Sequence, residues 1–383
     1  MKNLLSYFLV SQLIIVFSVF FEFDMISGSN QLYSAYAVHF ISSTFFAFGY
    51  VFKMLISNNK IINNKSAYEL SDRYFSVGYI LSILGIAVTI IQVSISMNPL
   101  VYLTELMSGR FNSYIREAYL LSSSQGGLSG IIKMFHSVPL AVYLLNMSIL
   151  TFLNTSKNSL ERVKKMNKFL LILLFIKVLF SLDRLTIMGI VSVNVYVMIR
   201  EKRMFKVRNI LLLIITLIVG EFLSKSRLEG YGLFEFLMLY GKLGINNLQL
   251  MIDSINQYTY GFSTILFPIS FIIRFFGIDF ISFESNYVWQ WNPAQYMVSY
   301  AFQDFGYFIF LYFFVIGFII RSIEYKAKYK KNIRFIAVYF LTLYCLVSFI
   351  SVPVIRSIEF WLMVIVSIFM TRFISSKNVL IEE

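Results

Sequence analysis

Apolar runs of about 20 residues recur along the whole 383-residue chain and constrain its fold more than any other feature. A helix needs roughly 20 apolar residues to cross about 30 Å of hydrocarbon. The runs therefore predict an all-α polytopic membrane protein, with about ten spanning helices in a single integral membrane domain over residues 1–383. We place the helices near residues 4–21, 32–56, 74–97, 131–153, 169–182, 185–199, 209–223, 299–320, 335–351 and 353–371.

The composition excludes several classes of protein. Only 14% of the residues are charged, whereas a soluble globular domain has about 25%. A cytosolic enzyme, a nucleic-acid-binding protein and a disordered protein are therefore excluded, although the formal net charge is +13. The one cysteine, Cys345, excludes a disulfide framework and a cysteine-based zinc site. Two histidines, His39 and His136, are too few for most metal-centred chemistry.

The positive charge is concentrated in alternate connections between the predicted spans. Lys and Arg favour the cytoplasmic side of a membrane. If the N-terminus is cytoplasmic, 23 of the 33 basic residues lie at Lys53 or in segments 1–3, 57–73, 154–168, 200–208, 321–334 and 372–383. This alternation predicts that both termini are cytoplasmic and that these clusters set the orientation. The first span is expected to be a retained anchor and not a signal peptide, because no A-x-A-like cleavage site follows it.

Two predicted outer connections are long, which is typical of functional loops. The first outer loop is expected at residues 98–130 and the main outer loop at residues 224–298. Three stretches of the main loop are themselves apolar: LFEFLMLYGKLG, NNLQLMIDSINQ and FSTILFPISFIIRFFG. We expect them to form short amphipathic or re-entrant helices at the outer membrane surface.

Ten basic residues fall outside the predicted cytoplasmic segments, so orientation does not explain them. Arginine binds phosphate oxygens through a bidentate fork and stays charged at any membrane depth. As a set these residues indicate an anionic, lipid-linked substrate, although each one could instead pair with a local carboxylate or reach the headgroups. Four are Arg110, Lys133, Lys225 and Lys242, and the candidate phosphate-binding residues are Arg116, Lys177, Arg184, Arg227, Arg274 and Arg356.

The sharpest local signal is the pair Asp183 and Arg184, between the predicted spans 169–182 and 185–199. At about 1.5 Å per residue these short spans reach only some 21–24 Å, so the pair is expected to lie recessed from the outer surface, where charges are costly. Asp183 is a candidate catalytic residue. Lys177 is expected to share a helix face with Arg184. A structural salt bridge between Asp183 and Arg184 is the alternative.

Other acids and bases lie near the predicted outer ends of spans. Glu221 and Glu229 flank Arg227, where either carboxylate could act as a base beside an anion-binding residue, or simply form a solvated face. His136 could exchange a proton near neutral pH, or could be a packed polar residue. Arg356 lies three residues before a glutamate on the same helix face, so pairing alone could explain it.

The stretch YVWQWNP at residues 287–293 ends the main outer loop. Its aromatic side chains Tyr287, Trp289 and Trp291 could belong to an interfacial belt. Beside Gln and Asn they could also form a sugar-binding platform, in which rings stack on C–H faces and amides bind hydroxyls. The chain contains no P-loop, dinucleotide fingerprint, H-E-x-x-H or G-x-S-x-G motif. We therefore expect neither a metal nor a cofactor.

Three short motifs carry a family resemblance: FSLDRLT at Phe180–Thr186, LYGKLGINN at Leu239–Asn247 and FQDFGY at Phe302–Tyr307. With the long outer loop and the outward-facing arginines, they resemble the Wzy-type polymerases of bacterial O-antigen and capsule synthesis. Tyr240, in the second motif, joins the candidate sugar-binding residues.

Members of this family carry R-x10-G in their outer loops. Arg116 and Gly127 fit that spacing, whereas Met238 stands where Arg227 would need its glycine. This departure leaves the role of Arg227 open.

The resemblance implies a transfer reaction at the periplasmic face of the bacterial inner membrane. A glycan on undecaprenyl diphosphate would be transferred to the terminal, non-reducing-end sugar of a lipid-linked repeat unit. Arginines would stabilise the leaving diphosphate without a metal. The base would come from Asp183, Glu221, Glu229 or His136. The expected partners are the undecaprenyl-diphosphate-linked oligosaccharide and membrane lipids, with a chain-length regulator and a flippase of the same pathway as further candidates and no nucleic acid.

Two other functions use similar residues. An O-antigen ligase would use the same donor, but we would expect a histidine in its long outer loop, and residues 224–298 contain none. A flippase or other transporter of lipid-linked oligosaccharide would more often show 12–14 spans, repeat symmetry and short loops.

Overall fold

A computed structural model describes most of the hydrophobic chain. The described residues are 3–21, 32–57, 67–96, 134–181, 183–201, 232–255, 258–261, 297–349 and 353–377, with isolated positions at 98, 100, 101, 104, 211, 214, 215, 217, 218, 220, 221, 264 and 265.

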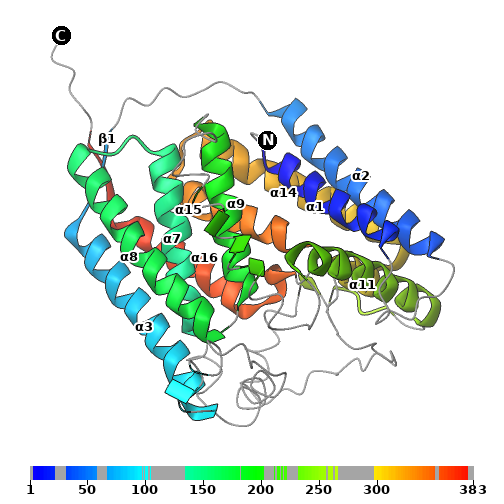
Figure 1. The fold of residues 1–383 in the computed structure, drawn as a ribbon. Helices are drawn as coiled ribbons and strands as arrows, with labels where there is room; N and C mark the ends of the chain where they lie inside the picture. The colour runs from blue at the N-terminus through cyan, green and yellow to red at the C-terminus, as the bar shows by residue number, and fades with distance from the viewer. Residues whose placement is uncertain are drawn as a thin grey trace, which may run out of the picture. The chain divides into compact units, whose positions relative to one another are not determined.

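Helix dominates the described residues (Figure 1). The α-helices are α1 (Leu4–Phe17), α2 (Tyr33–Ile56), α3 (Asp72–Ser96), α7 (Val138–Phe152), α8 (Lys157–Ser181), α9 (Arg184–Arg200), α11 (Leu233–Ser254), α13 (Met297–Phe305), α14 (Ile309–Lys328), α15 (Ile333–Ser348) and α16 (Ile358–Met370). Short 3-10 turns are η1 (Ser18–Phe20), η2 (Phe135–Ser137), η4 (Gly306–Phe308), η5 (Val354–Arg356) and η6 (Thr371–Phe373). Strands β1 (Ala67–Leu70) and β2 (Ile374–Lys377) form an antiparallel pair.

Four helical segments among the described residues are long and apolar enough to cross a membrane: Tyr33–Ile56, Asp72–Ile95, Phe135–Phe152 and Met297–Lys328. Shorter apolar helices occupy Leu4–Phe20, Leu185–Arg200 and Ile333–Ser348. The predominantly helical, membrane-type character expected from the sequence is therefore confirmed. The number of ten spans, the single domain and the cytoplasmic location of the termini stay predictions, and most of the predicted span 209–223 lies outside the described residues.

The predicted span at 169–182 begins too late. Helix α8 starts at Lys157 and has 25 residues, which gives a length of about 37 Å. Its first half carries Lys, Arg, Glu and Leu residues, which are good helix formers, so the helix continues beyond the apolar part. The depth of Asp183 and Arg184 relative to the outer membrane surface stays a prediction.

Helix α14 also extends beyond its predicted end at residue 320. Arg321 and Glu324 lie within it, 2% and 0% exposed, and form an ion pair with 3.3 Å between Nη1 and Oε2. The Tyr50 hydroxyl donates a hydrogen bond to the same carboxylate. Arg321 was expected in a cytoplasmic connection, but it is a buried, paired residue of the helix.

In the main outer loop, a single helix replaces two of the three expected short ones. Helix α11 runs for 22 residues and covers LFEFLMLYGKLG and most of NNLQLMIDSINQ. Most of the third stretch lies outside the described residues. Lys242 of α11 donates a hydrogen bond to the carbonyl of Phe21, and Gln249 accepts one from the Ala35 amide at 3.0 Å. These bonds attach α11 to the ends of α1 and α2.

The chain forms two compact units, each assembled from separate stretches. The first unit comprises residues 1–60, 234–325 and 345–361. The second unit comprises residues 61–233, 326–344 and 362–383.

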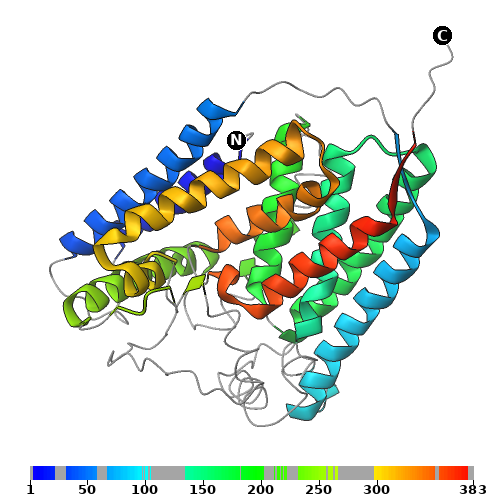
Figure 2. The ribbon, with the colours of Figure 1, turned by 180° about the vertical axis from the view of Figure 1, so that it is seen from behind.

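In the first unit, α2 and α14 cross in direct backbone contact. A Cβ atom at Gly49 would lie 2.0 Å from the carbonyl oxygen of Phe314, and one at Gly317 would lie 2.1 Å from that of Phe46. Both views show the two helices side by side (Figures 1 and 2). Small residues that let helices approach closely are typical of packing inside membranes.

In the second unit, α3, α7 and α8 pack against one another (Figures 1 and 2). A Cβ atom at Gly85 of α3 would lie 2.6 Å from the Phe135 carbonyl oxygen, and one at Gly78 would lie 2.3 Å from Met166. Glycines at the contact thus bring α3 close to η2 and α8.

Four of the segments predicted to be cytoplasmic meet in the second unit. β1 pairs with β2, and the Tyr68 amide donates to the Asn154 carbonyl at 2.8 Å. Lys331 donates to the Phe152 carbonyl at 3.0 Å, at the other end of the same short connection. The sequence segments 57–73, 154–168 and 372–383 are therefore in contact at one end of the helices, and Lys331 of segment 321–334 binds the adjacent end of α7.

Candidate functional site

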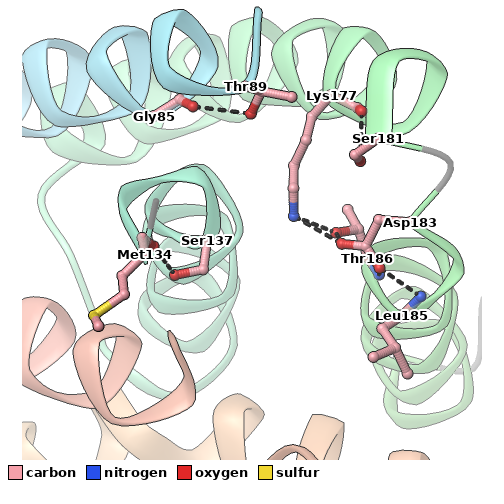
Figure 3. Close-up of polar contacts among 9 residues, drawn as sticks. All are labelled: Gly85, Thr89, Met134, Ser137, Lys177, Ser181, Asp183, Leu185 and Thr186. Atoms are coloured by element: carbon pink, nitrogen blue, oxygen red, sulfur yellow. Dashed lines mark hydrogen bonds and ion pairs between the residues drawn. The ribbon is translucent and has the colours of Figure 1, made fainter. Parts of the chain in front are cut away.

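Lys177, Asp183 and Thr186 form a polar cluster in the second unit. Lys177 is 2% exposed, and its Nζ donates to Asp183 Oδ2 at 2.9 Å and to Thr186 Oγ1 at 2.7 Å. Figure 3 shows the Lys177 side chain crossing from α8 to the start of α9. The Asp183 side chain is 23% exposed. The Asp183 carboxylate therefore neutralises the buried ammonium of Lys177. Lys177 lies near the C-terminal end of α8, whereas the other basic residues of this helix lie in its N-terminal half.

The local sequence explains this geometry. Asp183 is the N-cap of α9, and its Oδ1 accepts from the amides of Leu185 at 3.0 Å and Thr186 at 3.3 Å. A side-chain oxygen at this position satisfies amides that the first helical turn leaves without partners. The Thr186 hydroxyl donates to Asp183 Oδ2 at 2.5 Å. The chain thus begins a new helix at Arg184, so the expected continuous face from Lys177 to Arg184 is not formed.

His136 lies beside this cluster. It belongs to η2 before α7 and interacts electrostatically with both Lys177 and Asp183. Its buried Nδ1 has no hydrogen-bond partner among the described residues. The structure therefore brings together three residues that the sequence singled out separately.

The bonding of the cluster limits its chemistry. Both oxygens of Asp183 accept hydrogen bonds, from an ammonium, a hydroxyl and two amides, and such donors stabilise the charged carboxylate. A carboxylate held in this way is a weak base, and the lysine that balances it is already paired. Capping and charge neutralisation explain Asp183 and Lys177 without a substrate. Asp183 pairs with Lys177, six residues earlier. A salt bridge between Asp183 and Arg184 stays a prediction, because the Arg184 side chain lies outside the described residues.

A second polar cluster surrounds Arg356 in the first unit. The Arg356 guanidinium lies over the ring of Tyr300, with Cζ 3.3 Å from the ring centroid. It also interacts electrostatically with Asp304 and Tyr312. Arg356 ends the η5 turn between α15 and α16 and is half-buried. A guanidinium stacked on an aromatic ring is held in orientation while its edge can still bind an anion.

Asp304 is the buried acid of this second cluster. It is 0% exposed, and its carboxylate accepts hydrogen bonds from the Thr259 hydroxyl and from the amide and hydroxyl of Thr264. Asp304 lies in the FQDFGY motif but is not among the site residues predicted from the sequence. A lone carboxylate in an apolar helical run is by itself a functional signal, and it could have identified Asp304.

Two further candidates lie elsewhere in the described residues. Glu221 in the second unit faces Gly232, where a Cβ atom would lie 2.8 Å from its Oε1. Tyr240 lies half-buried on α11 in the first unit.

The other predicted site residues cannot be placed from the structure. The side chain of Arg184 lies outside the described parts, as do the residues Arg116, Arg227, Glu229, Arg274, Tyr287, Trp289 and Trp291. Their roles stay predictions. Within the described residues no group of three or more His, Cys, Asp or Glu side chains could hold a metal ion.

Comparisons with protein-family models, curated proteins and solved structures find no match to this chain. The fold therefore defines the class only as a predominantly helical protein with helices long and apolar enough to cross a membrane.

Proposed function

We propose that this chain is a metal-independent membrane glycosyltransferase that polymerises lipid-linked oligosaccharide repeat units. It would act at the outer face of a bacterial inner membrane. The glycan donor would be an oligosaccharide on undecaprenyl diphosphate, and the acceptor would be the non-reducing-end sugar of a second lipid-linked unit.

The observation that carries this proposal is the setting of Arg356. Its guanidinium is oriented by Tyr300 in a turn between apolar helices, beside the buried charge of Asp304. Asp304 accepts hydrogen bonds from Thr259 and Thr264, so its carboxylate is fixed in position beside the guanidinium. An arginine in this position suits the diphosphate of a lipid whose tail lies among the helices.

The contacts of the second unit support the proposed orientation. Four segments that the charge pattern assigns to the cytoplasm meet at one end of its helices. The cluster of Lys177, Asp183 and His136 lies at the opposite end of α8, about 30 Å away along the helix axis if residues 157 to 177 rise by about 1.5 Å each. This separation agrees with an outer location for that cluster.

The proposed chemistry needs one charge to be stabilised and one proton to be removed. The bond between the anomeric carbon and the diphosphate oxygen breaks, and the acceptor hydroxyl oxygen bonds to that carbon. Arginines stabilise the negative charge that develops on the leaving diphosphate. The hydroxyl proton passes to a base. Because Asp183 accepts several hydrogen bonds, Glu221, Glu229 and His136 are the better candidates for that role.

Deleting the gene and separating surface polysaccharide on a gel tests this proposal. Loss of long chains, with retention of the core carrying a single repeat unit, supports a polymerase. Loss of every repeat, including the single one, would instead indicate a ligase or a flippase.

A further inference from the structure

Residues 258–261 and 264–265, in the predicted main outer loop, are bound to the end of α13. The amides of Thr259 and Tyr260 donate to the carbonyls of Gln303 at 3.0 Å and Asp304 at 3.1 Å. The last carbonyls of a helix have no partner inside the helix, so these bonds cap α13 from a distant part of the chain.

The Asp304 carboxylate extends the same attachment. Its Oδ1 accepts from the Thr259 hydroxyl, and its Oδ2 accepts from the Thr264 amide at 2.7 Å and the Thr264 hydroxyl at 2.5 Å. The segment thus binds both the backbone and the side chain of one residue. A buried carboxylate with several donors is held in one orientation.

Glycine makes this close approach possible. Gly306 follows α13 with a φ of +53°, and a Cβ atom there would lie 2.5 Å from the Tyr258 ring. Gly261, in the bound segment, has a φ of +94°. Glycine adopts such angles without steric cost. Both the bound segment and the end of α13 therefore have a glycine where the backbone conformation favours one.

The same face of α13 connects this attachment to Arg356. Tyr300 and Asp304 are four residues apart on α13, so they share a helix face. Arg356 stacks on Tyr300 and interacts with Asp304, while Tyr312 lies within reach of both Asp304 and the Thr264 hydroxyl. A substitution at Thr264 is therefore expected to alter the position of Arg356, because the Asp304 carboxylate interacts with both residues.

We propose that Asp304 is a positioning residue, which ties the outer-loop residues 258–261 and 264–265 to α13 and orients Arg356 to bind the diphosphate of the lipid-linked substrate. This inference rests on the proposed function for the identity of its ligand. Asp304 acts through Arg356, because both of its oxygens accept hydrogen bonds from Thr259 and Thr264 that hold the carboxylate in place.

The test measures binding of inorganic pyrophosphate to the purified full chain by titration calorimetry. Thr264→Val keeps the side-chain shape but removes the hydroxyl donor, whereas Thr264→Ser keeps the donor. We expect Thr264→Val to weaken pyrophosphate binding about tenfold, as loss of about 1.4 kcal/mol of binding free energy would do, and Thr264→Ser to restore most of it. Arg356→Gln is expected to abolish measurable binding.

Controls separate positioning from general damage. Asp253→Asn removes an exposed carboxylate from α11 in the same unit and should bind pyrophosphate like the unmodified chain. Thr259→Val repeats the test at the other oxygen of Asp304, should Thr264→Val fail to fold. Equal melting temperatures for the valine and serine variants would show that the difference in affinity is not a difference in folding.

Two results would overturn the inference. The first is unchanged pyrophosphate affinity in folded Thr264→Val or Thr259→Val while Arg356→Gln loses binding. The second is no pyrophosphate binding by the unmodified chain. The deletion experiment judges the proposed function separately. Normal polysaccharide chains in the deletion strain, with the predicted binding pattern, would reject the polymerase and keep the positioning role.

Discussion

The cations Lys177 and Arg356 lie in different surroundings. Lys177 is almost fully buried and donates to Asp183 and Thr186, so its charge is balanced locally. Arg356 is half-buried and stacked on Tyr300, an arrangement that fixes the plane of its guanidinium, and it also interacts with Asp304. At the scale of single residues, we therefore propose that Lys177 contributes to stability and that Arg356 binds the ligand.

Lys177→Met should destabilise the fold, because it leaves the Asp183 carboxylate without its cation. Removing one partner of a fully buried pair costs about 3–5 kcal/mol, and we expect about 2 kcal/mol because Asp183 is partly exposed. Thermal unfolding of the purified protein measures this loss. Lys168→Met, an exposed lysine on the same helix, is the matched control and should unfold like the unmodified chain. Adding Asp183→Asn to Lys177→Met should cost less than the two single losses combined, and strict additivity would show that the two residues do not interact.

Replacing Arg356 with either Gln or Lys should slow the proposed polymerisation. Gln removes the charge, and Lys keeps it but cannot stack in a plane or bind two oxygens side by side. We expect both variants to slow polymerisation by about tenfold to a hundredfold, as loss of roughly 1.4–2.8 kcal/mol of transition-state stabilisation would do. Chain length on a polysaccharide gel, at matched protein abundance, is the measurement. Normal ladders in Arg356→Gln would remove Arg356 from the site.

At the scale of helices, apolar runs predict where a helix exists better than where it ends. The charged residues at 157–168 indicate a connection, yet α8 begins at Lys157 because those residues also favour helix. The same holds for α14, which continues through Arg321 because Glu324 balances its charge. Helix ends outside an apolar layer depend on such partners, and their positions are not visible in a hydropathy pattern.

Replacing a glycine at the α2–α14 contact with a residue that has a side chain should destabilise the protein. The leucine side chain of Gly317→Leu would clash with the Phe46 carbonyl oxygen. Because this carbonyl belongs to the backbone of α2, the clash is relieved only if the two helices move apart. We expect a loss of about 3 kcal/mol in the free energy of unfolding, observed as a lower melting temperature. Val315→Leu, at an exposed position on α14, is the control. Equal stability of the two variants would contradict the close crossing.

At the scale of the whole molecule, part of the candidate site was predictable. The cost of charge in apolar helices indicates Lys177 and Asp183, and the capacity to exchange a proton indicates His136; the structure places the three together. The partners of Asp304 were not predictable, because Thr259 and Thr264 precede it by about 40 residues and their meeting depends on folding. Sequence spacing informs contacts within one helix, whereas contacts between a loop and a helix require the fold.

The predicted orientation can be measured with single cysteines. Cys345 is the chain's one cysteine and is buried, so Cys345→Ser gives a suitable background. Asn98→Cys and Lys164→Cys place exposed thiols on the predicted outer and cytoplasmic sides. In intact spheroplasts a membrane-impermeant maleimide should label Asn98→Cys alone, and lysis should allow labelling of Lys164→Cys. The reverse pattern would invert the topology and place the proposed reaction on the wrong side.

The central claim is that the chain itself joins lipid-linked repeat units. The most direct measurement uses the purified protein in vesicles, supplied with lipid-linked repeat units extracted from the deletion strain and no divalent metal. We predict glycan chains that lengthen by whole repeat units, with one undecaprenyl diphosphate released for each new bond. If the repeat units stay single while the folded protein only moves them across the bilayer, or transfers them only to an added lipid A-core acceptor, the account is contradicted.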